Sequence, residues 1–114
     1  MVDWKAALES TAGSPGLLNE LIAVALEEIP KLERLLDEAL AAENAREVQR
    51  VAHTIKGTGR VFADRKLIEA AGKVEALGES ANLDQIEPSR RELEAETARF
   101  LAELQQSAED EGSK

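Results

Sequence analysis

The feature that most constrains the fold is a long run of apolar residues at helical spacing in the first half of the chain. Between residues 18 and 40 these positions keep one phase: Leu18, Ile22, Ala25, Ile29, Leu32, Leu36 and Leu40. Their period is that of an amphipathic α-helix with one buried face. Because the phase continues across Pro30, we predict a single kinked helix that runs to about Ala42.

Capping residues predict two shorter helices on either side of this long one. Asp3 can cap a helix that ends near Glu9, before a glycine- and proline-containing break. Asn44 can cap a helix that runs to about Phe62.

The second half of the chain predicts two more helices. The first begins at about Asp64, runs through Leu77 and stops at Gly78. Asn82 can cap the next, whose apolar stripe continues past Pro88 in its early turns. The stripe consists of Ile86, Leu93, Thr97, Phe100 and Leu104.

Four long helices with short connections predict an all-α fold. We expect an antiparallel four-helix bundle with a short additional N-terminal helix over residues 1–106. Residues 107–114 are polar and are expected to form a frayed, disordered tail. With 114 residues, of which 43% are hydrophobic, the chain suffices for one domain with a single core.

Composition excludes several classes of function. One His and no Cys cannot form the usual transition-metal sites, so we expect no metal or cofactor of the protein's own. A net charge of −9 and 3% aromatic residues argue against nucleic-acid binding. No segment approaches the roughly 20 apolar residues of a membrane span, and the N-terminus lacks a signal-peptide pattern. We therefore expect a cytoplasmic protein without a membrane partner. We also expect it to be a monomer.

The single histidine, His53, lies on the polar face of the third predicted helix. It is rotated by roughly 140° from Val48, which lies in the apolar stripe of that helix. The residues that share this direction or flank it are Arg46, Arg50, Lys56, Gly57 and Arg60. The imidazole is therefore surrounded by cations.

This local charge opposes that of the rest of the chain. Residues 45–66 contain six basic and two acidic residues, a net charge of +4, whereas the remaining residues sum to −13. A basic island on an acidic domain attracts anions and acidic partner surfaces. For Arg46, Arg50 and Arg60, an ordinary solvated face is the alternative to a role in docking.

Two glycines near His53 have different expected roles. Gly59 falls on the apolar face and would let a neighbouring helix approach, whereas Gly57 points outward and leaves the imidazole uncovered. They could instead terminate the helix, but the apolar stripe continues in phase to Phe62.

The run from Ala52 to Gly57, AHTIKG, resembles the core of histidine-containing phosphotransfer (HPt) domains. The segments Glu27–Pro30 and Lys73–Glu75 extend the resemblance, which covers about residues 17–104. It implies that His53 accepts a phosphoryl group from a receiver-domain aspartyl phosphate or a histidine kinase and passes it to a receiver Asp. It also implies that Lys56 sits beside the phosphoryl oxygens and that Gly57 leaves room for the receiver.

The chemistry of the residues agrees with this implication. Neutral imidazole is nucleophilic near neutral pH and needs no dedicated base. Phosphoryl transfer needs mainly positioning and charge stabilisation, and Lys56 can supply a point charge. No acidic cluster lies on this face, so Mg²⁺ is expected on the receiver. The domain is then a carrier without catalytic activity of its own.

Glu75 is a candidate to orient the imidazole. If the third and fourth helices are antiparallel and turn near Asp64, Glu75 lies level with His53. We hypothesise that it accepts a hydrogen bond from Nδ1, which leaves Nε2 as the nucleophile. The alternative is that Glu75 extends to solvent or pairs with a basic residue.

A second class of function stays open, a helical adaptor that docks a receiver or kinase domain without being phosphorylated. The intact His53 argues against it. Within the phosphotransfer interpretation, the domain could be free-standing or belong to a hybrid or chemotaxis-type kinase.

Overall fold

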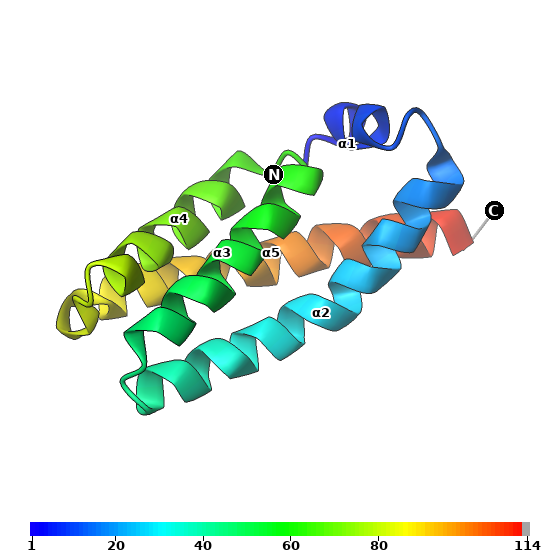
Figure 1. Ribbon diagram of the computed structural model, residues 1–114. Helices are drawn as coiled ribbons and strands as arrows, with labels where there is room; N and C mark the ends of the chain where they lie inside the picture. The colour runs from blue at the N-terminus through cyan, green and yellow to red at the C-terminus, as the bar shows by residue number, and fades with distance from the viewer. Residues whose placement is uncertain (113–114) are drawn as a thin grey trace.

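The computed structural model describes residues 1–112, in which every regular element is a helix. These elements are α1 (Trp4–Ser10), α2 (Pro15–Ala41), α3 (Ala45–Val61), α4 (Arg65–Glu79), the 3₁₀ turn η1 (Leu83–Gln85) and α5 (Glu87–Gly112). Helices α2 to α5 pack side by side, the chain reverses direction between successive ones, and α1 lies across one end (Figure 1). The predicted all-helical bundle is confirmed. None of the described helices is long and apolar enough to cross a membrane.

The helices begin at capping residues that the sequence predicts. The side chains of Asp3, Asn44 and Asp64 each accept a hydrogen bond from a backbone N–H three residues further on, at the starts of α1, α3 and α4. The long helix α2 is continuous through Pro30, as the unbroken phase predicts, and Ser14 caps its start.

The predicted stop at Gly78 is wrong, because α4 continues to Glu79. The left-handed residue after α4 is Ala81, with a φ of 56°. Gly78 instead faces α3, where an added Cβ would lie 2.8 Å from the backbone nitrogen of Gln49. Gly59 is a second point of close approach, where an added Cβ would lie 3.1 Å from Cγ1 of Ile68. Two glycines thus bring α3 and α4 together.

The predicted limits of the last helix are also wrong. Asn82 precedes η1 and makes no side-chain capping bond, and α5 begins at Glu87. Pro88 fits the first turn of a helix because its nitrogen has no proton to donate. At the other end α5 runs to Gly112, so residues 107–112 are helical where we expected a frayed tail. Residues 113–114 of that tail lie outside the described residues.

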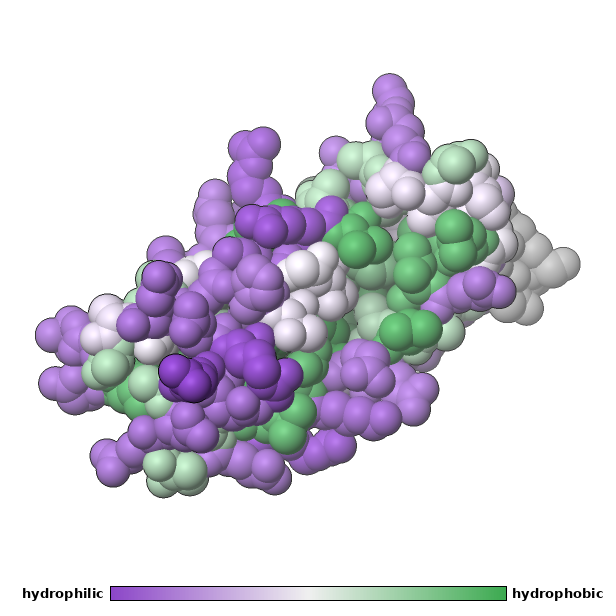
Figure 2. Space-filling view, in the orientation of Figure 1, coloured by the Kyte–Doolittle hydropathy of each residue, from purple (hydrophilic) through white to green (hydrophobic). Residues whose placement is uncertain are grey.

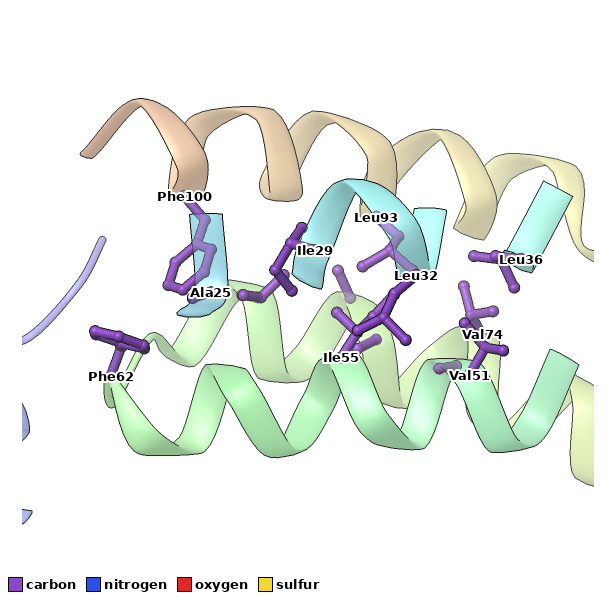
Figure 3. Packing of buried hydrophobic residues seen from close by; sticks show 14 of the residues in the cluster. Ala25, Ile29, Leu32, Leu36, Val51, Ile55, Phe62, Val74, Leu93 and Phe100 are labelled. Atoms are coloured by element: carbon purple, nitrogen blue, oxygen red, sulfur yellow. The ribbon is translucent and has the colours of Figure 1, made fainter. Parts of the chain in front are cut away.

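The core lies between α2, α3, α4 and α5 (Figure 3). Each of these helices contributes side chains with no exposed surface, among them Ile29, Ile55, Val74 and Leu93. Phe62 closes one end of the core, with its ring edge-on to Phe100 at a centroid distance of 5.4 Å.

A polar cluster centred on a buried arginine joins α5 to α2, and the sequence patterns do not predict it. Arg90 on α5 is 7% exposed and forms ion pairs of 2.8 Å with both Glu33 and Asp37 on α2. Thr97 donates a hydrogen bond of 2.6 Å to Glu33. Because a buried cation needs such partners, the cluster favours one register between the two helices.

We predict opposite stability effects for substitutions at a glycine that faces another helix and at a glycine that faces solvent. Gly78→Ala should destabilise the bundle by about 1–3 kcal/mol, because the new methyl group meets the backbone of α3. Gly57→Ala is the matched control, since a Cβ there has no neighbour within 4 Å, and it should stabilise by roughly 0.5–1 kcal/mol through helix propensity. Urea unfolding measures both changes, and equal shifts would contradict close packing at Gly78.

Candidate functional site

Helix α3 presents His53 to solvent because of the phase of its apolar face. The neighbouring residues Val51, Ala52 and Ile55 are fully buried, whereas the side chain of His53 is 63% exposed. The imidazole is therefore held by a rigid element and remains accessible to another protein.

One nitrogen of the imidazole has a partner on the neighbouring helix. Nδ1 of His53 contacts Oε2 of Glu75 on α4 at hydrogen-bonding distance. Within residues 1–112, Nε2 has no hydrogen-bond partner. A carboxylate beside Nδ1 favours the tautomer with its proton on Nδ1, which leaves the lone pair of Nε2 free.

The other oxygen of the same carboxylate binds Lys56. The Lys56 Nζ donates to Oε1 of Glu75, and the two side chains are only 17% and 15% exposed. The aliphatic part of Lys56 passes over α4 at Gly72, where an added Cβ would lie 3.9 Å from its Cδ. Glu75 thus contacts both the imidazole and a basic residue, which the sequence analysis treated as alternatives.

The charge of Glu75 is stabilised by these two neighbours. Its burial opposes ionisation, but the hydrogen bonds from Lys56 and His53 outweigh that cost and hold the pKa of the Glu75 carboxyl below its usual value. Glu75 is therefore an anion at neutral pH, and it faces the imidazole as a fixed negative charge.

The three arginines of the predicted ring are exposed along α3. Arg46 and Arg50 line a shallow hollow together with Gln49, His53 and Glu75. Arg50 is partly neutralised by Glu47, which accepts a hydrogen bond of 2.9 Å from its Nε. Arg60 is exposed near the C-terminal end of the helix.

Gly57 lies one turn beyond His53 and leaves the surface open. An added Cβ at this position would meet no atom within 4 Å. Gly57 therefore leaves open surface one helical turn from the imidazole.

An apolar groove between α2 and α3 adjoins the site, and the sequence analysis missed it. Its lining residues are Leu21, Val24, Ala25, Glu28, Leu32, Thr54, Thr58, Val61 and Phe62. Figure 2 shows the hydrophobic surface over the start of α2 and the end of α3, beside hydrophilic surface over the first half of α3. Apolar residues outside the core stripe of α2, such as Val24, were the available signal.

Comparison with known families agrees with this site. A family model described as the Hpt domain matches residues 20–110, which include all the site residues described above. The chain belongs to the Hpt domain family, which supports a phosphotransfer carrier role in two-component signalling. A search of curated proteins and a search of solved structures found no match.

The contact between His53 and Glu75 predicts the tautomer of the imidazole. In the neutral ring the proton should reside on Nδ1, and Glu75→Ala should remove that bias because Glu75 is the hydrogen-bond partner of Nδ1 among residues 1–112. The ¹⁵N chemical shifts of His53 report the tautomer directly. Glu69→Ala, an exposed change on the same helix, is the control and should leave the shifts unchanged. An unchanged tautomer in Glu75→Ala would show that the carboxylate does not orient the ring.

Proposed function

We propose that this protein is a phosphorelay carrier that accepts a phosphoryl group on Nε2 of His53. The donor is the aspartyl phosphate of a receiver domain or a histidine kinase, and the acceptor is a receiver Asp. The observation that carries this proposal is an exposed imidazole whose Nδ1 is held by a partly buried carboxylate while Nε2 is free, in a chain of the Hpt domain family.

The transfer step uses the two nitrogens differently. The lone pair of Nε2 attacks phosphorus, an N–P bond forms, and the bond between phosphorus and the donor's carboxylate oxygen breaks with its electron pair leaving on that oxygen. The proton on Nδ1 stays in place. The ring becomes cationic as the N–P bond forms, and the carboxylate of Glu75 stabilises that positive charge. Transfer to the next receiver is the reverse of this step.

Lys56 and the partner supply the remaining charge. The carboxylate of Glu75 contacts both Lys56 and the imidazole and so holds Lys56 close to His53. From there the Lys56 ammonium can offset the charge of the negative phosphoryl group. Residues 1–112 contain no group of three or more His, Cys, Asp or Glu side chains that could hold a metal ion. We assign Mg²⁺ to the acidic site of the receiver and a carrier role to this chain, as membership of the Hpt domain family suggests.

Docking combines the basic island with the apolar groove. Arg46, Arg50 and Arg60 attract the acidic phosphorylation site of a receiver over a distance of about a Debye length. The groove begins at Thr54, the residue after His53, and offers contact area for an apolar helix face. An anchored receiver would then have its Asp near Nε2.

The first test of this function removes the nucleophile. His53→Gln should keep the helical circular dichroism signal, because the side chain is exposed, and should lose all acid-labile label from ³²P-phosphorylated receivers. Label that persists on this variant would exclude His53 as the acceptor. A wild-type protein that binds receivers but never becomes labelled would favour the adaptor function.

A second test places bulk beside the imidazole. Gly57→Gln should weaken receiver binding and slow phosphate exchange severely, while helix propensity makes the bundle more stable by about 0.5–1 kcal/mol. Gly16→Gln, at an exposed glycine in the first turn of α2, is the control. If Gly57→Gln exchanges phosphate as fast as the parent, the receiver docks elsewhere on the bundle.

A further inference from the structure

Helix α2 carries a second stripe of side chains beside its core face, exposed except at Leu21, which is partly buried against the core. Its members alternate at spacings of four and three residues, which is the repeat of a coiled-coil seam: Leu17, Leu21, Val24, Glu28, Lys31 and Leu35. Leu17, Val24 and Leu35 are 44%, 55% and 39% exposed, and they make up three of the five exposed large hydrophobic residues in the described part of the chain. The stripe is rotated by roughly 100° from the core stripe of α2.

The centre of this stripe is a pair of opposite charges. The Nζ atom of Lys31 lies 3.9 Å from Oε1 of Glu28. It also lies 3.3 Å from Oε1 of Glu27, which is beside the stripe. The side chains of Glu28 and Lys31 are 52% and 50% exposed. Such a long, exposed pair contributes little to the stability of one chain, so both charges are available to another partner.

Between residues 24 and 35 the order of residues along the stripe is complementary to itself, whereas Leu21 of each copy falls opposite Glu38 of the other. When two copies of α2 lie antiparallel about a two-fold axis between residues 29 and 30, Glu28 of each copy faces Lys31 of the other. The same axis places Val24 of each copy opposite Leu35 of the other. A symmetric dimer requires this property, because each patch must match its own image. A different partner gives no reason for it.

We propose that this protein forms a symmetric homodimer through α2, with Val24 against Leu35 and Glu28 against Lys31 across the two-fold axis. The apolar pairs supply contact area, and the two interchain ion pairs set the register and the antiparallel orientation. The stripe is about 28 Å long, which gives a small interface and places the dimer in the transient class. This proposal replaces the monomer expected in the sequence analysis.

The dimer also bears on the docking groove. Leu21, Val24 and Glu28 belong to the stripe and also line the groove beside His53. A second copy seated on α2 therefore covers one wall of the groove. This consequence rests on the proposed function, whereas the dimer itself does not.

A charge-swap experiment tests the dimer without reference to phosphotransfer. In Glu28→Lys both central charges become positive, and in Lys31→Glu both become negative, so each variant alone should dimerise at least about tenfold more weakly than wild type. A 1:1 mixture of the two variants restores both ion pairs and should form heterodimers with nearly wild-type affinity. The double variant should also dimerise. Sedimentation velocity up to about 0.5 mM measures all of these states.

The controls separate this mechanism from other causes. Glu69→Lys makes the same change in net charge on α4 and should leave the dimerisation constant unchanged, and circular dichroism verifies that each variant is folded. A wild-type protein that stays monomeric at every concentration, or single variants that dimerise as well as wild type, would overturn the proposal. So would a mixture that fails to associate. Labelling of His53 by a phosphorylated receiver is measured separately, so either idea can fail alone.

Discussion

The close approach of α3 and α4 is the constraint on which the geometry around His53 depends. Gly59 and Gly78 remove the side chains that would hold these helices apart, and each faces the other helix directly. At this spacing a glutamate on α4 can reach a ring on α3 and a lysine one turn further along. Gly78, which the sequence analysis interpreted as a helix stop, therefore has a packing role. By letting α4 approach α3, it helps to bring Glu75 within reach of His53 and Lys56 without contacting them.

The parts of the site that follow from local rules could be predicted from the sequence. The apolar phase of α3 places His53 in solvent, and the capping residue Asp64 fixes where the chain turns, which sets Glu75 level with His53. Both depend only on helical geometry and one tight connection. The family resemblance agrees, and the match to the Hpt domain covers residues 20–110, which include both positions.

The features that the sequence did not reveal depend on tertiary packing. The role of Gly78 requires knowing how near α3 comes, and the pairing of Arg90 with Glu33 requires the register of α5 against α2. Residues 107–112 were misjudged because their polarity matches both a loose tail and an exposed helical turn. The apolar groove likewise appears only once two helices lie together.

Charge and apolar surface are divided between adjoining parts of the same face. In the proposed docking mode, the arginines of α3 attract a partner over distance and their effect weakens with salt, whereas the groove acts only on contact and depends on shape. Under that proposal, different residues govern the rate of encounter and the choice of partner. Substitutions in one set can change the rate of encounter while the choice of partner is retained.

The two engaged oxygens of Glu75 limit how this position can diverge. An aspartate is one methylene shorter and cannot span the same two partners, while a glutamine offers one acceptor and turns an amide donor toward the other. A lineage that loses this glutamate must therefore replace the lysine contact and the control of the imidazole together. Positions 53, 56 and 75 lie on two helices but depend on one another. We therefore expect a single substitution at Glu75 to be costly and compensated substitutions at these positions to be tolerated better.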